Sequence, residues 1–193
     1  PFGVFPTRHG RHSGLIVPRF GQSVSEGRYL RELGYYWAAS EYWDARLTMD
    51  YYDRSGWLAK SRMDYAWRYH FSGTVSGSLT RRNFAQGKNE RRWDIAVSHN
   101  QTLGSTAALR ASGYFVSDDS FYRDFSFNQN QRLTRNLRSQ ATFSKNWPEA
   151  KSNVSINVSD VRDLDNGSQQ RLLPQISFYY GQRQLFGGAS GSA

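Results

Sequence analysis

"WLAKSRMDYAWRYHF", residues 57–71, alternates between two kinds of side chain. The odd positions are mostly apolar or aromatic, whereas the even positions hold most of the charge. Successive side chains of a β-strand point to opposite faces, so the alternation predicts one long strand with two unlike faces. We interpret the odd face as meeting lipid and the even face as lining an aqueous lumen, as in a transmembrane barrel.

The same period of two recurs along the chain, in residues 44–53, 91–100, 131–147 and 153–161. Turn-forming residues separate these runs, so we predict about ten antiparallel strands joined as an up-and-down meander within residues 13–186. The expected fold class is all-β: a segment of an antiparallel transmembrane β-barrel. Residues 187–193 are small and polar, which predicts a flexible tail.

The composition also favours a barrel over a compact soluble fold. Mean hydropathy is −0.73 and only 38% of the 193 residues are hydrophobic, yet 16% are aromatic. No run of 18 apolar residues is present, so the sequence predicts no transmembrane helix. Aromatic side chains gather near the expected strand ends, the arrangement of girdles at two lipid–water boundaries; the candidates are Trp37, Trp43, Trp57, Trp67 and Tyr69.

The net charge limits the classes of partner that the chain could bind, and the absence of cysteine excludes some kinds of site. A net charge of +9 indicates a polyanionic partner, which leaves nucleic acid, anionic lipid and phosphorylated glycolipid open. With no cysteine, the chain holds no disulfide and no thiolate metal site. Because it opens with Pro1 rather than Met, we expect a processed product or a fragment.

Several charged side chains fall on the expected lumen face of adjacent strands: Arg46, Asp50, Lys60, Arg62, Asp64 and Arg68. One interpretation is a solvated wall with cross-strand ion pairs. The other is a path for the phosphates and sugars of a glycolipid, since Arg and Lys attract the anion.

Little in the sequence points to catalysis or to metal binding. Ser98, His99 and Asn100 are adjacent on a strand and so point to alternate faces, which prevents a relay among them. We predict that the chain is no enzyme and needs no cofactor. His9 and His12 have no carboxylate cluster beside them, and we predict no metal site there. Residues 160–170 predict a hairpin turn, and a cation site at 117–125 stays open.

Nucleic-acid binding by a soluble basic sheet is a further alternative. A platform that stacks bases needs its aromatic and cationic groups on one face. Here they fall on opposite faces of the expected strands, so we predict no nucleic-acid partner. A generic outer-membrane barrel, such as a porin or an adhesin translocator, is the nearer alternative.

Four stretches carry a more specific signal. "FPTRHGRHSGLIVPRFGQSVSEG" (5–27) precedes "YYWAASEYWDARLTMDYYDRSGW" (35–57), and "SDDSFYRDF" (117–125) precedes "LLPQISF" (172–178). In this order they resemble the N-terminal part of the barrel of LptD, the family of lipopolysaccharide-assembly proteins of the outer membrane. The residues that match the motifs at the barrel entry are Arg11, Ser13, Gly14, Leu15, Pro18, Tyr35, Tyr36, Trp37, Ser40, Asp44, Ala45 and Leu47.

The resemblance implies a large barrel that passes lipopolysaccharide into the outer leaflet. Its partners would be lipopolysaccharide, outer-membrane lipid, a plug lipoprotein of the LptE type and a periplasmic bridge protein of the LptA type. Residues 1–12 would be the end of a periplasmic jellyroll or connector. The family's disulfide cysteines have no counterpart in this chain.

The resemblance also implies a lateral gate between the first and last strands of the barrel. The family has a proline in each of the first two strands; Pro18 matches the first, and Gly34 occupies the position of the second. Proline removes a backbone donor and glycine leaves no side chain to pack, so either residue weakens strand pairing. We therefore expect Pro18 and Gly34 to mark the gate.

Overall fold

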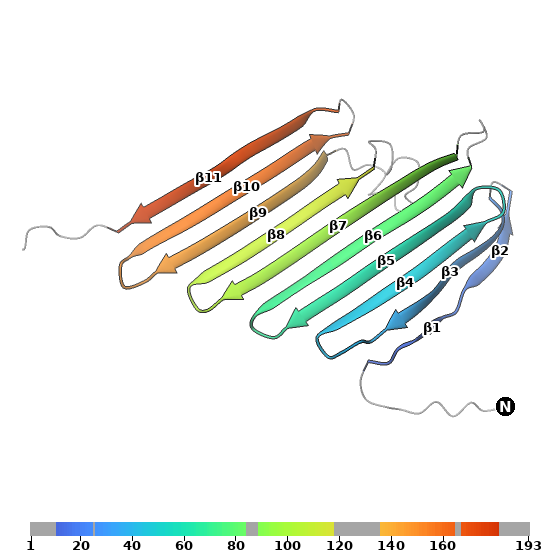
Figure 1. Cartoon of the computed structure of the whole chain (residues 1–193), viewed down its shortest axis with the longest axis horizontal. Helices are drawn as coiled ribbons and strands as arrows, with labels where there is room; N and C mark the ends of the chain where they lie inside the picture. The colour runs from blue at the N-terminus through green and yellow to red at the C-terminus, as the bar shows by residue number, and fades with distance from the viewer. Residues whose placement is uncertain (1–10, 25, 84–88, 118–135, 165–166, 182–193) are drawn as a thin grey trace, which may run out of the picture.

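The computed structural model describes residues 11–24, 26–83, 89–117, 136–164 and 167–181. These residues form eleven strands in one antiparallel sheet, ordered as in the sequence except that β1 and β2 both pair with β3 (Figure 1). The strands are β1 (Gly14–Ile16), β2 (Arg19–Ser23), β3 (Gly27–Trp37), β4 (Trp43–Tyr52), β5 (Gly56–Trp67), β6 (Phe71–Asn83), β7 (Asn89–Leu103), β8 (Ala107–Val116), β9 (Asn136–Trp147), β10 (Ser152–Asp163) and β11 (Gln169–Tyr180).

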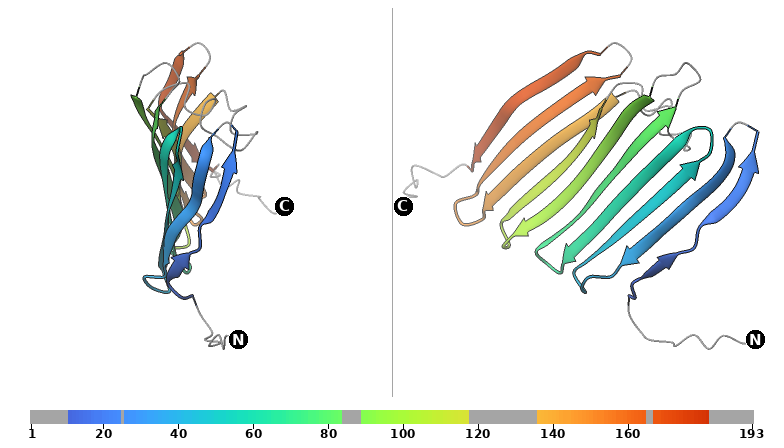
Figure 2. Two further views of the ribbon diagram at one scale, coloured as in Figure 1. Left: turned by 90° about the vertical axis from the view of Figure 1, so that its right-hand side faces the viewer. Right: turned by 45° about the vertical axis from the view of Figure 1, so that its right-hand side comes forward.

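The predicted all-β, up-and-down architecture is confirmed. The count is eleven rather than about ten, and Pro18 lies in the break that separates β1 from β2. Figure 2 shows a single curved layer, and within the described ranges every element belongs to this layer. The sheet is open, since β1 and β2 form one edge and β11 forms the other. No helix in the described part is long and apolar enough to cross a membrane.

The strand register places the two kinds of side chain on opposite faces. Across β4 and β5, Leu47 pairs with Ser61, Met49 with Ala59 and Tyr51 with Trp57, all on what we call the apolar face. Asp44 pairs with Asp64, Arg46 with Arg62 and Thr48 with Lys60 on the polar face. The period-2 alternation in the sequence therefore extends coherently across neighbouring strands.

Large side chains on the apolar face stay open to the surroundings. Strand after strand contributes one or more residues that are at least one-third exposed: Leu33, Tyr35, Trp37, Leu47, Met49, Tyr51, Met63, Trp67, Trp93, Ile95, Phe115, Trp147, Ile176 and Phe178. A contiguous apolar surface of this extent indicates contact with lipid or with another protein. Trp57, Tyr65 and Trp67 lie on the same face, and none of them is buried within the described sheet.

Residues 57–71 do not form a single strand, so this part of the prediction was wrong. β5 ends at Trp67, and Phe71 begins β6 opposite it. The three residues between them form a tight turn in which the His70 N–H donates to the Trp67 carbonyl oxygen at 2.9 Å. Tyr69 takes up the left-handed conformation, with φ of 67°. Arg68, Tyr69 and His70 therefore lie at the end of the sheet and not along its faces.

Other expectations lie outside the described residues. They are most of the connector at 1–12, His9, nearly all of the motif at 117–125, the tip of the turn at 165–166 and the tail at 187–193. Their roles stay predictions.

Candidate functional site

The edge formed by β1 and β2 is interrupted where the sequence places Pro18. Ile16 pairs with Gly34 and Arg19 pairs with Arg31, while the two residues between them, Val17 and Pro18, pair with nothing in the described chain. We call Val17–Pro18 the edge gap. Proline has no N–H to donate, so it cannot complete the ladder at this point. β3 is thus flanked by two short strands of three and five residues in place of one long strand.

Gly34 has a clearer role in packing than in weakening the ladder. It is paired on both sides, with Ile16 of β1 and Thr48 of β4. A Cβ added at Gly34 would lie 2.2 Å from the backbone oxygen of Leu47 and 2.8 Å from Cγ2 of Thr48. Glycine therefore permits a close approach of β3 to β4. Its part in a gate stays a prediction.

Opposite the edge gap, β3 contains a β-bulge that the sequence did not reveal. Leu30 pairs with Tyr51 and Leu33 with Met49, so Arg31 and Glu32 together face Asp50. Glu32 has φ of 61°, a conformation that few residues with a side chain adopt. The Glu32 N–H donates to Asp50 Oδ1 at 2.7 Å. A bulge leaves one residue unpaired and bends the strand.

A hollow of about 410 Å³ opens on the polar face beside the edge gap. We call it the edge hollow; its lining comes from β1, β3, β4 and β5 and consists of Ile16, Glu32, Arg46, Thr48, Lys60, Ser61 and Arg62. Three of the predicted lumen residues, Arg46, Lys60 and Arg62, thus meet next to Pro18. Glu32 adds one negative charge to the same wall.

The cations of the edge hollow differ in their partners. Lys60 Nζ lies 2.7 Å from Asp50 Oδ2, whose side chain is only 3% exposed. Arg62 forms a two-pronged contact with Asp64, at 2.7 Å through Nε and 2.9 Å through Nη2. Arg46 is exposed and has no hydrogen-bonding or ion-pair partner among the residues that the structure describes. It is therefore the cation best placed to meet an outside anion.

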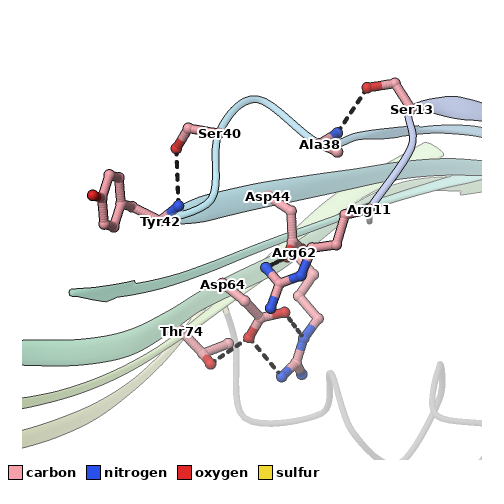
Figure 3. A network of polar contacts seen from close by, with 9 residues as sticks. All are labelled: Arg11, Ser13, Ala38, Ser40, Tyr42, Asp44, Arg62, Asp64 and Thr74. Carbon is pink, nitrogen blue, oxygen red and sulfur yellow. Dashed lines mark hydrogen bonds and ion pairs between the residues drawn. The ribbon is translucent and has the colours of Figure 1, made fainter. Parts of the chain in front are cut away.

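A polar network ties the segment before β1 to the sheet (Figure 3). Arg11 Nη1 donates to Asp44 Oδ2 at 2.7 Å, and the Ala38 N–H donates to Ser13 Oγ at 2.9 Å. Thr74 of β6 donates to Asp64 at 2.6 Å, which extends the polar contacts to a further strand. Arg11, Ser13 and Asp44 belong to the motif quoted above, so the motif has a local structural meaning: it anchors the chain at the entry of the first strand.

Arg68, expected on the lumen wall, lies instead in the β5–β6 turn. A second hollow of about 430 Å³ opens there, and Arg68, His70 and Arg110 contribute to its lining. Contact of Arg68 with a glycolipid stays a prediction.

The predicted girdle residues occupy both ends of the sheet. Trp37 and Trp43 pack edge to face at 4.9 Å between ring centroids, and Tyr42 stacks on Trp67 at 5.0 Å, all at the end where β3 and β5 finish. Trp57, at the start of β5, lies at the opposite end. Tyr69 is 81% exposed in its turn. These positions fit two boundaries, and the girdle role stays a prediction.

Comparisons with a family model and with individual proteins point to the same family. The family model described as "LptD protein" matches residues 1–192. The chain is 26% identical to the LPS-assembly protein LptD of Actinobacillus pleuropneumoniae serotype 7 (strain AP76), over 97% of the chain and 25% of the relative. It is 27% identical to that of Haemophilus ducreyi, over 96% and 24%, and 27% identical to that of Vibrio vulnificus (strain YJ016), over 93% and 23%. The chain thus spans about a quarter of the length of these relatives.

Proposed function

Because the chain belongs to the LptD family, whose members are outer-membrane proteins, we propose that it forms part of a barrel that assembles lipopolysaccharide there. We propose further that the glycolipid moves sideways past the edge gap at Pro18. The observation that carries this proposal is the position of the edge hollow, with Arg46, directly beside the interrupted edge.

The two faces of the sheet support a place in the membrane. Acyl chains would cover the apolar face, since bilayer lipid accepts exposed Leu, Met and Phe side chains at no hydration cost. The polar face would border water, where the charged pairs of β4 and β5 remain hydrated.

The lengths of the connections support an orientation. The turns at 38–42, 68–70, 104–106 and 148–151 are all short and share one end of the sheet. The other end also has short turns, as at 53–55, but it holds the longest connection between strands, residues 117–135. In outer-membrane barrels the short turns face the periplasm and the longer loops face outward. β1 begins at the same end of the sheet as these four short turns (Figure 1). The chain would then enter the barrel from the periplasmic end, as a preceding periplasmic jellyroll would require.

The energetics of the edge favour opening at this point. Each backbone hydrogen bond contributes about 0.5–1.5 kcal/mol, so an edge that lacks pairs opens at a smaller free-energy cost than a continuous one. The phosphates of a glycolipid would meet Arg46 in the edge hollow, while its acyl chains would pass on the apolar side near Val17 and Phe20, both highly exposed. A generic porin needs no such pairing of a gap with a basic hollow.

The further partners follow from family membership alone. A plug lipoprotein of the LptE type would face the polar side of the sheet, and a bridge protein of the LptA type would reach the periplasmic end. Both are proposals, because the chain spans only about a quarter of the length of the relatives it matches.

Photocrosslinking in cells tests the proposal. A photoreactive phenylalanine analogue replaces Pro18 in the full-length protein, and a second variant carries it at Gln140, on the polar face of β9 away from the edge. We expect covalent capture of lipopolysaccharide at position 18 and little at 140. Equal capture at both, or capture at 140 alone, would contradict the gate. Gly34 is a poor probe site, since any side chain there meets the backbone of Leu47.

A further inference from the structure

We propose that Asp50 is a positioning residue that keeps the edge gap open by holding the bulge of β3 in place. This inference rests on the proposed function and adds a residue to the gate. Asp50 lies on β4, one strand removed from the gap, and it acts through the backbone of Glu32.

The backbone is irregular on both sides of the edge gap. On the edge side, Pro18 has no N–H. On the β3 side, Glu32 and Leu33 lie opposite the gap, and the Glu32 N–H is turned to β4, where it donates to the Asp50 carboxylate. A bulge takes the backbone groups of its strand out of the regular ladder. While Asp50 holds the bulge, an N–H restored at position 18 would therefore find no regularly placed β3 carbonyl to accept it.

Asp50 is built into the sheet more firmly than a solvated wall residue. Its side chain is 3% exposed, and its two oxygens have separate donors at 2.7 Å: the Glu32 N–H and Lys60 Nζ. A buried carboxylate is costly unless it is hydrogen-bonded and paired, and both conditions are met here. Lys60, at 42% exposure, supplies the counter-charge from the wall of the edge hollow.

The contact explains why Glu32 keeps an unfavourable backbone conformation. A left-handed conformation is unfavourable at a non-glycine residue and persists where neighbouring contacts compensate for it. The Asp50 bond supplies such compensation. Without it, β3 would gain by returning to the extended conformation, in which its backbone groups can pair across the gap.

A merely structural role predicts a different result. If Asp50 only stabilised β3 and β4, its loss would loosen the edge, and its effect would add to that of Pro18. If Asp50 holds the gap, removing both devices would tighten the edge more than the two single changes together. The two roles are therefore distinguished by whether the edge tightens or loosens, and by whether the effects of the two substitutions add.

The experiment is a double-mutant cycle on the full-length protein in detergent micelles. The variants are Asp50→Leu, Pro18→Ala and both combined, and the readout is hydrogen–deuterium exchange of peptides covering 14–23 and 27–37. We expect little slowing in each single variant and about tenfold slowing in the double variant, the change that one restored backbone hydrogen bond produces. Additive effects, or faster exchange in the double variant, would overturn the proposal.

Two further variants keep the test decisive. Asp50→Asn retains an oxygen that can accept from Glu32, so we expect exchange as in the wild type. Glu32→Gly is added to the double variant: glycine holds a positive φ without the Asp50 carboxylate, so the gap should stay open there. If Asp50→Leu fails to fold, Asp50→Ala takes its place. Closure in the glycine background would contradict the proposal.

A second readout separates this inference from the proposed function. Lipopolysaccharide capture is measured in cells with the photoreactive analogue at Val17, so that Pro18 stays available for substitution. Closure of the edge, seen as slower hydrogen–deuterium exchange, together with loss of lipopolysaccharide capture supports both proposals. Closure with unchanged capture keeps the role of Asp50 and contradicts the gate. If hydrogen–deuterium exchange at the edge is unchanged in the double variant, the role of Asp50 is contradicted, whether or not lipopolysaccharide is captured.

Discussion

Asp44 and Asp64 lie directly opposite each other on β4 and β5, and each carboxylate has its own guanidinium, Arg11 for the first and Arg62 for the second. Like charges directly opposite each other in a sheet destabilise it. The two arginines offset that repulsion and, at the same time, attach the segment before β1 to the wall of the sheet. Ion pairs thus fix the start of the first strand, next to an edge at which Val17 and Pro18 lack backbone pairing.

Arg62→Met should destabilise the protein modestly. The change removes the two-pronged contact and leaves Asp44 and Asp64 with one cation between them. Because the Arg62 side chain is largely exposed, we expect a loss of about 0.5–1 kcal/mol in the free energy of unfolding. Urea unfolding in lipid vesicles measures it. The stability of Arg62→Lys should fall between those of the wild type and Arg62→Met, since lysine cannot make the two-pronged contact with Asp64. Equal stability of all three proteins would show that the Arg62–Asp64 ion pair contributes nothing.

Gly34→Ala should destabilise the sheet far more than the same change at Gly14. A methyl group at Gly34 overlaps the backbone oxygen of Leu47, whereas one at Gly14 meets no atom within 4 Å. Overpacking of this kind typically costs about 1–3 kcal/mol. Urea unfolding of both variants measures the difference, and Gly14→Ala serves as the matched control. Similar stability of the two variants would contradict the close approach of β3 and β4.

The period of two in the sequence was enough to predict the faces of β4, β5, β7, β9 and β10, because burial on one side imposes it residue by residue. Pro18 likewise marked the edge gap, since a missing N–H is a property of the residue itself. The turn at 68–70 was missed because it contains no Gly, Pro, Asn or Asp, and the alternation continues through it by chance.

The bulge at Arg31–Glu32 could not be predicted from local sequence. "RYLREL", residues 28–33, contains nothing that favours a left-handed residue at Glu32. What holds the bulge is Asp50, eighteen residues further along the chain, together with Lys60. Such a device becomes visible only once the strands are placed side by side.

Tyr69→Gly and Tyr69→Val should have opposite effects on stability. Tyr69 has φ of 67°, which glycine adopts freely and a β-branched residue resists. We expect the glycine variant to match or exceed the wild type and the valine variant to lose about 1–2 kcal/mol. Refolding into vesicles followed by urea titration measures both. Equal losses in the two variants would indicate that the aromatic ring, and not the backbone, decides the stability of the turn.

Trp57 and Trp67 should report two different membrane boundaries. They lie at opposite ends of β5 on the apolar face. In variants that keep one tryptophan each, fluorescence should be quenched more strongly by lipids brominated near the headgroup than by lipids brominated near the chain end. A tryptophan placed at Met63, near the middle of β5, should show the reverse order. Quenching by aqueous acrylamide alone, without any effect of the brominated lipids, would contradict the membrane position.

Arg46→Ala should weaken contact with the glycolipid without weakening the fold. Arg46 has no ion-pair partner in the described part of the chain, so its removal leaves no uncompensated charge, and we expect a change below about 0.5 kcal/mol in stability. It lines the edge hollow beside Pro18, where a glycolipid phosphate would sit, so capture at position 18 should fall severalfold. Arg138→Ala is the matched control, because Arg138 is an exposed cation on the same face of β9 but distant from the edge. If both variants lowered capture equally, the overall positive charge of the wall, and not the edge hollow, would be attracting the glycolipid.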